Sequence, residues 1–252
     1  MLKTRIIPTL LYKDFGLVKG VGFDSWRRVG SALQAVNVYS IRNVDELVFL
    51  DITATGEGRA PDFDTVDTLS DECFMPLSVG GGIRSIEDVR RLLMVGADKV
   101  VVNSALVENP GLITDIARRF GSQCVVASID FREDGRGGRE AYTHSGRKPT
   151  GLSPVELARE AERLGAGEIL LTSIERDGAM EGYDLPCLRR VSEAVDITVV
   201  ASGGAGTYAD MHAALTEGKA SAVAAASIFH YTEQTPLEAK RYLADRGIPV
   251  RM

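Results

Sequence analysis

The chain has 252 residues, of which 44% are hydrophobic, and a formal net charge of −6. The length suits one large domain, the acidic balance argues against a nucleic-acid partner, and no apolar run approaches the ~18 residues of a membrane span. The three cysteines (Cys73, Cys124 and Cys187) form no close-spaced pair, so neither a disulfide framework nor a zinc site is predicted. Because Met1–Arg5 leads straight into an apolar run, no signal peptide is expected, and the cytoplasm is the predicted location.

Short apolar runs recur along the chain and predict strands that are covered on both faces. The helix signals between them are clear, since Ser153-Pro154-Val155-Glu156 combines an N-cap, a proline at the first helical position and a capping-box glutamate. Ser85 precedes another amphipathic pattern. The alternation of strands and helices predicts an α/β fold. The eight predicted strands lie near residues 5–11, 46–52, 76–79, 98–103, 124–130, 168–173, 197–202 and 221–226.

The two halves of the chain repeat each other. Residues 46–52 (Glu-Leu-Val-Phe-Leu-Asp-Ile) match residues 168–174 (Glu-Ile-Leu-Leu-Thr-Ser-Ile) at an offset of 168 − 46 = 122. A half-chain repeat of strand-helix pairs predicts a single (β/α)8 TIM barrel over residues 1–252, with half-barrels of approximately 1–122 and 123–252. Catalytic residues are then expected at the carboxyl ends of the strands.

Two connections exceed the usual length, residues 12–30 after the first strand and 131–152 after the fifth. The second contains a glycine-rich segment, 133–139, that predicts a turn or hairpin. Long loops over the top face of a barrel usually cover the substrate.

Glycine-rich segments follow two of the predicted strands, at residues 80–85 and 202–207. Glycines let backbone amides approach an anion, and the helix N-terminus that follows adds partial positive charge. Asn103-Ser104 and Ala226-Ser227 follow the next strand in each half. The simpler alternative is that the glycines only make tight turns. Two loops, each paired with a serine, favour two phosphate sites and a ligand with a phosphate at each end.

These motifs resemble the cyclase subunit of imidazole glycerol phosphate synthase, and the resemblance runs from Arg5 to Arg251. It implies a barrel that takes ammonia from a separate glutaminase and converts a bis-phosphorylated substrate into imidazole glycerol phosphate and an aminoimidazole ribonucleotide. Nothing in the sequence suggests a metal or another cofactor. The most specific stretches are residues 50–54, 80–85, 121–124, 142–146, 165–173 and 176–178.

The resemblance also implies which residues contact the substrate. Lys19, in the first long loop, is a candidate substrate lysine or else a solvated charge, and Asp51 ends the second strand facing the barrel mouth. The anchors carried over are Gly82, Asn103 and Ser104 for one phosphate, and Asp177, Gly178, Gly204, Ala226 and Ser227 for the other.

One position departs from the family pattern. The family uses two aspartates as general acid and base, one at the end of strand 1 and one at the end of strand 5. The second is present as Asp130, but the first aligns at 130 − 119 = 11, where the chain has Leu11. Loss of one acid or base costs about 10²–10⁴ in rate.

Charged residues at the strand starts agree with the family. Arg5, Glu46, Lys99 and Glu168 match its charged ring around the ammonia entrance, and Asp98 matches a glutaminase contact. The simpler reading is a salt-bridged barrel floor, but the alternating signs favour a retained entrance. No cysteine has the glycine-flanked context of a nucleophile, and Cys124 is predicted inside the fifth strand, so the glutaminase is expected to be a separate subunit.

Three functions remain open from the sequence. The favoured one is a cyclase-like paralogue that passes ammonia from a glutaminase to a sugar or other acceptor in surface-polysaccharide synthesis. The alternatives are an ordinary cyclase subunit of histidine biosynthesis and a non-catalytic subunit that activates the glutaminase. A phosphoribosyl isomerase barrel is a more distant possibility, against which the charged ring argues.

Overall fold

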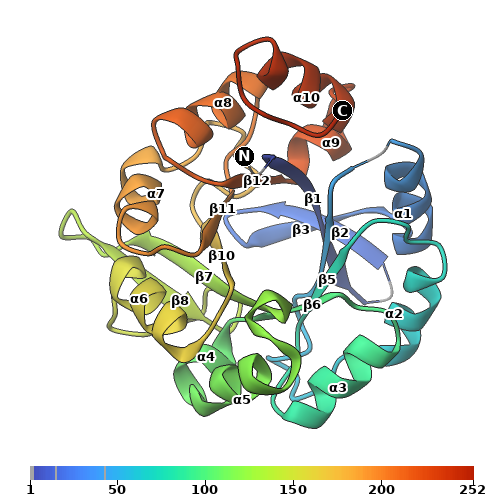
Figure 1. Cartoon of the computed structure of the whole chain (residues 1–252), viewed down its shortest axis with the longest axis vertical. Helices are drawn as coiled ribbons and strands as arrows, with labels where there is room; N and C mark the ends of the chain where they lie inside the picture. The colour runs from blue at the N-terminus through green and yellow to red at the C-terminus, as the bar shows by residue number, and fades with distance from the viewer. Residues whose placement is uncertain (1–2, 15, 43) are drawn as a thin grey trace.

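Eight parallel strands close into a barrel in the computed structural model, which describes residues 3–14, 16–42 and 44–252 (Figure 1). Each strand pairs with the next in chain order, and β10 closes the barrel against β7. The predicted TIM barrel is therefore confirmed, with strand ends within a few residues of the predicted ones. The barrel strands are β1 (Arg5–Lys13), β4 (Leu47–Asp51), β5 (Leu77–Gly80), β6 (Lys99–Val102), β7 (Val125–Glu133), β10 (Glu168–Ser173), β11 (Thr198–Ser202) and β12 (Ala222–Ala225).

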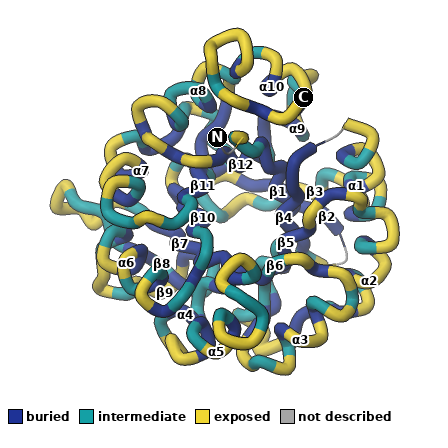
Figure 2. Tube along the Cα trace, in the orientation of Figure 1, coloured by how far each residue is buried: buried dark blue, intermediate teal, exposed yellow. Residues whose placement is uncertain are grey.

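Helices surround the barrel, and the buried parts of each helix are seen in Figure 2. Their buried apolar residues belong to one hydrophobic cluster with apolar residues of the strands. The capping box predicted at Ser153 is formed, and Ser85, predicted only to start a helix, forms one as well. Gly165 ends the helix that begins after Ser153 in a left-handed conformation. The helices are α1 (Ala32–Ile41), α2 (Phe63–Ser70), α3 (Ile86–Met94), α4 (Ser104–Glu108), α5 (Gly111–Phe120), α6 (Pro154–Leu164), α7 (Leu185–Ser192), α8 (Tyr208–Thr216), α9 (Ser227–Tyr231) and α10 (Pro236–Ala244). Among the described residues, no helix is both long and apolar enough to cross a bilayer.

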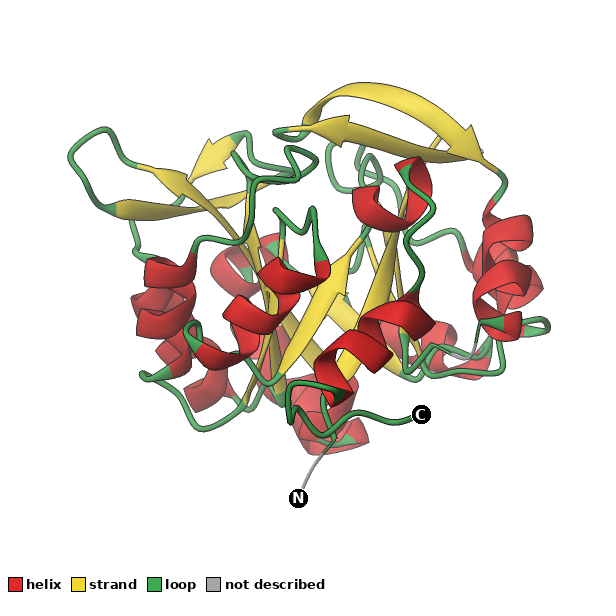
Figure 3. Cartoon of the chain, turned by 90° about the horizontal axis from the view of Figure 1, so that it is seen from above, coloured by secondary structure: helices red, strands yellow, loops and turns green. Residues whose placement is uncertain are grey.

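Both long loops fold as antiparallel extensions of the sheet at the same end of the barrel (Figure 3). After β1 the chain forms β2 (Gly16–Val21) and β3 (Asp24–Gly30), and after β7 it forms β8 (Arg139–Thr143) and β9 (Lys148–Pro149). The hairpin predicted in the second loop is confirmed. The first loop was predicted only as a long cover, because its glycines and charges hide the pairing of β2 with β1.

Cys124 was wrongly predicted to lie inside a strand. It ends a one-turn 3-10 helix, η1 (Ser122–Cys124), and β7 begins at the next residue. The boundary follows from Gly121, whose φ of +94° turns the chain out of α5. The division into half-barrels near residue 122 stays a prediction.

The barrel interior is divided into three levels. Side chains alternate along each strand, so every second residue points inward. At mid-height the inward side chains form a dry plug, with polar groups at the two ends of the barrel. The plug consists of Ile7, Val48, Val101, Val126, Leu170, Val200, Ala222 and Ala224.

Candidate active site

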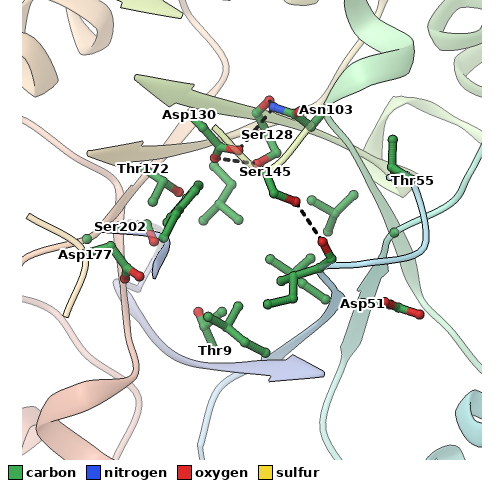
Figure 4. Close-up of a pocket in the computed structure, with 18 of the residues that line it drawn as sticks. Thr9, Asp51, Thr55, Asn103, Ser128, Asp130, Ser145, Thr172, Asp177 and Ser202 are labelled. Atoms are coloured by element: carbon green, nitrogen blue, oxygen red, sulfur yellow. Dashed lines mark hydrogen bonds between the residues drawn. The ribbon is translucent and has the colours of Figure 1, made fainter. Parts of the chain in front are cut away.

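A cavity of about 410 Å³ opens at the carboxyl ends of the barrel strands, under the two hairpins (Figure 4). This volume lies in the usual range for a small-molecule site. The structure brings all the predicted mouth residues to its lining. They are Lys19, Asp51, Gly82, Asn103, Ser104, Asp130, Asp177, Gly178, Gly204, Ala226 and Ser227. Their roles toward a ligand stay predictions.

Asp130 is buried on the inward-facing side of β7, at the point where the strand begins to pair with β8. Burial raises the pKa of its carboxyl to about 7, against the lowering effect of the Ser128 hydroxyl, and the negative charge of Asp177 adds to the rise. Ser128 Oγ lies 3.4 Å from Asp130 Oδ1, and the Asn103 side-chain nitrogen lies 3.4 Å from Oδ2. A carboxyl with this pKa can take up or release a proton near neutral pH, as general acid–base catalysis requires.

Leu11 occupies the corresponding place on β1. It lies beside Leu50 of β4 and Val18 of β2, is 8% exposed, and lines the cavity. Position 11 therefore presents an alkyl side chain to the cavity rather than to the outer packing of the barrel. That it stands in place of a second acid or base stays a prediction.

The first hairpin is held down by an ion pair. Lys19 Nζ lies 2.5 Å from Asp177 Oδ2, and Lys19 is 1% exposed. Gly22 N donates to Asp177 O at 2.8 Å, which adds a backbone bond between the hairpin and the loop after β10. Lys19 is thus a fully paired buried cation, and not the solvated charge that the sequence left open.

The first predicted phosphate site lies between β5 and α4. Gly82 has a φ of +74°, and a Cβ there would lie 2.6 Å from Arg59 O, so the turn needs glycine. The Asn103 side-chain amide donates to Ser128 O at 3.1 Å and Tyr142 O at 3.2 Å, which ties α4 to β7 and β8. No side chain caps the first amides of α4 among the described residues. Those amides and Ser104 are the groups that can face an anion.

The second predicted phosphate site lies between β11 and α9. Gly204 is held close to the backbone of Gly182, whose amide donates to Gly204 O at 2.8 Å. Tight packing is therefore one reason for this glycine, as the simpler alternative supposed. Ser227 is different, because its Oγ is buried and has no hydrogen-bond partner among the described residues. An unpaired buried hydroxyl at the mouth of a cavity fits a ligand-binding group.

Asp51 lines the cavity, but its oxygens are already occupied. Oδ1 accepts from the amides of Thr53 and Ala54, each at 3.0 Å, and Arg59 Nη1 lies 3.1 Å from Oδ2. These contacts organise the loop after β4. Asp51 thus holds the loop after β4 in place, and a direct contact of Asp51 with substrate stays a prediction.

Sequence reasoning missed several cavity residues. Phe23 and Trp26 of the first hairpin bring aromatic rings to the lining, and Thr9 brings a hydroxyl from inside the barrel. Ser202, whose segment was singled out only for its glycines, brings another hydroxyl. The hairpin residues could not be assigned without the pairing of β2 and β3. Thr9 could have been found, since it lies two residues before Leu11 and therefore shares its inward side of the strand.

The four charged residues at the other end of the barrel form a closed ring of ion pairs. Arg5 contacts Glu46 at 2.5 Å and Glu168 at 3.0 Å, and Lys99 contacts the same two carboxylates at 2.9 and 2.8 Å. Ser78 Oγ adds a bond to Glu46 Oε1 at 2.7 Å. The ring lies below the dry plug, so a molecule that enters the barrel from this end must pass it.

Asp98 lies outside this ring. Its Oδ2 accepts from Leu77 N at 2.8 Å and so joins the starts of β5 and β6. Three large apolar side chains are exposed at the same end of the molecule, because the C-terminal ends of the helices and the loops into the strands lie there. Ile41 and Phe74 are each 86% exposed and Met94 is 70% exposed.

Comparison with known proteins places this arrangement in a family. The family model described as "Histidine biosynthesis protein" matches residues 5–235. The chain is 54% identical over 254 residues to the "Imidazole glycerol phosphate synthase subunit HisF" of Caulobacter vibrioides (strain NA1000 / CB15N), which covers 100% of this chain and 97% of that protein. It is 53% identical over 251 residues to the protein of the same description from Hyphomonas neptunium, covering 100% and 99%.

Proposed function

The chain belongs to the family of histidine biosynthesis proteins, and from this premise we propose that it is the ammonia-using barrel subunit of an imidazole glycerol phosphate synthase. A separate glutaminase delivers ammonia to the ring of Arg5, Glu46, Lys99 and Glu168. The ammonia reacts at the opposite end with a substrate that carries two phosphates. The observation that supports this most is the full-length likeness to subunits of that name, at 53–54% identity.

The geometry agrees with ammonia entry at one end of the barrel and reaction at the other. The ion-pair ring and the cavity lie at opposite ends of one barrel, with the plug between them. Asp130, with its pKa raised to about 7, is the proton-transfer group at the cavity end. The two serines Ser104 and Ser227, on separate sides of the mouth, suit a phosphate each.

A second candidate function rests on Leu11. The cyclisation of the family needs a second acid or base at this position, and an alkyl group supplies none. A paralogue that keeps the ammonia path but serves another acceptor, such as a sugar of surface-polysaccharide synthesis, would tolerate this replacement. The relatives' descriptions favour histidine biosynthesis over this paralogue.

Turnover of the bis-phosphorylated family substrate with supplied ammonia separates the two candidates. A histidine auxotroph that lacks the cyclase tests whether wild-type turnover is fast enough for growth. Complementation by the wild type supports the ordinary cyclase and excludes the paralogue. Loss of complementation, together with activity in the Leu11→Asp variant, excludes the ordinary cyclase. A protein that binds the glutaminase but shows no turnover in either form excludes the ordinary cyclase and leaves the paralogue with another acceptor and the non-catalytic activating subunit.

Docking of the glutaminase is expected at the strand-start end, on the surface formed by Phe74, Met94 and Asp98. We expect Phe74→Asp to weaken the complex about tenfold or more, because it places a charge in an apolar contact. Asp98→Asn tests the charge at that position while keeping the oxygen that accepts from Leu77 N, which a charge reversal would lose. Affinities of the purified pair by isothermal titration calorimetry provide the measurement.

Val21→Asp is the matched control for docking, since Val21 is 53% exposed in the hairpin at the opposite end. It should leave the affinity unchanged. Docking at the strand-start end would be contradicted if Val21→Asp and Phe74→Asp lowered the affinity equally. It would also be contradicted if the wild-type pair did not associate at micromolar concentrations.

A further inference from the structure

Thr9 carries a buried hydroxyl that no described protein group satisfies. Its side chain points into the barrel from β1, the residue is 7% exposed, and Oγ1 has no hydrogen-bond partner among the described residues. Figure 4 shows Thr9 among the side chains that surround the cavity. Leaving such a hydroxyl unpaired costs about 1–3 kcal/mol, so its presence in the core needs a reason.

The internal repeat explains why the hydroxyl is unpaired. Thr9 corresponds to Ser128 at the same offset, 128 − 9 = 119, that relates Leu11 to Asp130. Ser128 Oγ donates to Asp130 Oδ1, two residues further along the same strand. On β1 the equivalent acceptor would be residue 11, but Leu11 has no oxygen. The replacement at position 11 therefore leaves the Thr9 hydroxyl free to bind a ligand.

The position of Thr9 selects the kind of ligand. Two residues below it on the inward side of β1 lies Ile7, part of the dry plug, and two residues above it lies Leu11. The barrel strands bring alkyl groups and the hydroxyls of Ser128, Thr172 and Ser202 to the same cavity, and the lysine that lines it, Lys19, is paired with Asp177. A phosphate would be unpaired here, whereas a small neutral molecule that donates and accepts hydrogen bonds would be satisfied.

On the basis of the proposed ammonia-using function, we infer that Thr9 holds ammonia after it has passed the plug and before it reacts. While ammonia waits, its lone pair accepts from the Thr9 O–H; when the acceptor that the phosphate sites hold is in place, ammonia instead donates an N–H to Thr9 Oγ1, which leaves the lone pair free to react. No bond forms or breaks at Thr9. It is a positioning residue for the nucleophile.

The test uses Thr9→Val, which removes the hydroxyl and keeps the shape. We expect the KM for ammonium to rise about three- to tenfold, the loss of one hydrogen bond, while the KM for the phosphorylated substrate stays within about twofold. Thr9→Ser should restore the ammonium KM. The melting temperature of Thr9→Val should equal or exceed that of the wild type, because an unsatisfied hydroxyl is removed. The assays use the wild-type chain, because an aspartate at position 11 would itself accept from the Thr9 hydroxyl, as Asp130 does from Ser128.

Ser192→Ala is the matched control. Ser192 Oγ, in α7, is also buried without a partner among the described residues, but it lies outside the cavity lining. Its removal should leave the ammonium KM unchanged. An unchanged ammonium KM in Thr9→Val, or a melting temperature clearly below the wild type, would overturn the inference and make Thr9 a structural residue.

A binding measurement keeps this test separate from the proposed function. At an alkaline pH where free ammonia is present, ammonium chloride should stabilise the wild type against heat more than potassium chloride at equal ionic strength. The difference should disappear in Thr9→Val and persist in Ser192→Ala. If no form of the protein turns over substrate, the proposed function fails, and this measurement alone decides the role of Thr9: a salt-specific difference supports it, and equal stabilisation by the two salts overturns it.

Discussion

The Leu11→Asp variant is expected to convert the bis-phosphorylated family substrate about 10²–10⁴-fold faster than the wild type when ammonia is supplied. The reason is geometric: position 11 already points into the cavity, opposite Asp130 in the repeat, and the free hydroxyl of Thr9 lies two residues below it to orient a new carboxylate. Steady-state kcat with saturating ammonium chloride and no glutaminase is the measurement, since it isolates the chemistry at the cavity.

Leu11→Asn provides the control for size and polarity, because it can form the same hydrogen bond to Thr9 but cannot transfer a proton. It should remain at the wild-type rate. Both variants bury a polar group where the wild type has a leucine, so some loss of stability is expected in each. Equal rates for the Asp and Asn variants would show that position 11 does not limit proton transfer in this chain.

The Asp130→Asn variant is expected to lose about 10²–10⁴ in kcat in either background, since it removes the buried acid–base group of the cavity. It is also expected to be more stable than the wild type at pH 8. Burial raises the pKa of Asp130 to about 7 in the folded protein, above its ordinary value of 3.8. The folded state therefore binds more protons than the unfolded state between these two values, and the wild type loses stability as the pH rises through that window.

The stability difference between Asp130→Asn and wild type should therefore grow from about pH 4 to about pH 7 and stay level above it, reaching at most ~4 kcal/mol. Urea unfolding at several pH values measures it. Asp134→Asn is the control, because Asp134 lies exposed in the turn between β7 and β8, where amides of Arg136 and Gly138 lower the pKa of its carboxyl. It should show no such gain at high pH. A difference for Asp130→Asn that does not change with pH would contradict the raised pKa.

The barrel followed from local patterns, because strands covered on both faces read as apolar runs. The spacing of the glycine loops after β5 and β11 marked two candidate phosphate sites at the strand ends. The full set of eleven mouth residues, with Lys19, Asp177 and Gly178 among them, needed the resemblance to the cyclase family. The ring at the other end was expected from the same resemblance, and the structure places its members at the strand starts: Arg5, Lys99 and Glu168 start three barrel strands and Glu46 precedes a fourth.

Features that depend on contacts between distant segments could not be predicted in this way. The Lys19–Asp177 ion pair joins residues that are 158 positions apart, and it needs the hairpin of β2 and β3 to bring Lys19 inward. Asp51 has the right place for a substrate ligand, but the loop that follows contacts both of its oxygens, through the amides of Thr53 and Ala54 and through Arg59. The unpaired state of Thr9 depends on the residue at position 11, so it emerges only when neighbours on one strand are compared across the repeat.

The most direct test of the account is to follow nitrogen through the complex. The barrel and its glutaminase are supplied with glutamine labelled with ¹⁵N in the side-chain amide, together with an excess of unlabelled ammonium chloride, and the product is examined by mass spectrometry. The measurement uses the wild type and, in parallel, the Leu11→Asp variant. If ammonia passes through the barrel to the cavity, the product carries the ¹⁵N label despite the excess of unlabelled ammonium. The ammonia then enters at the ring of Arg5, Glu46, Lys99 and Glu168. A product in which the label is diluted to the level of the bulk ammonium would contradict transfer through the barrel.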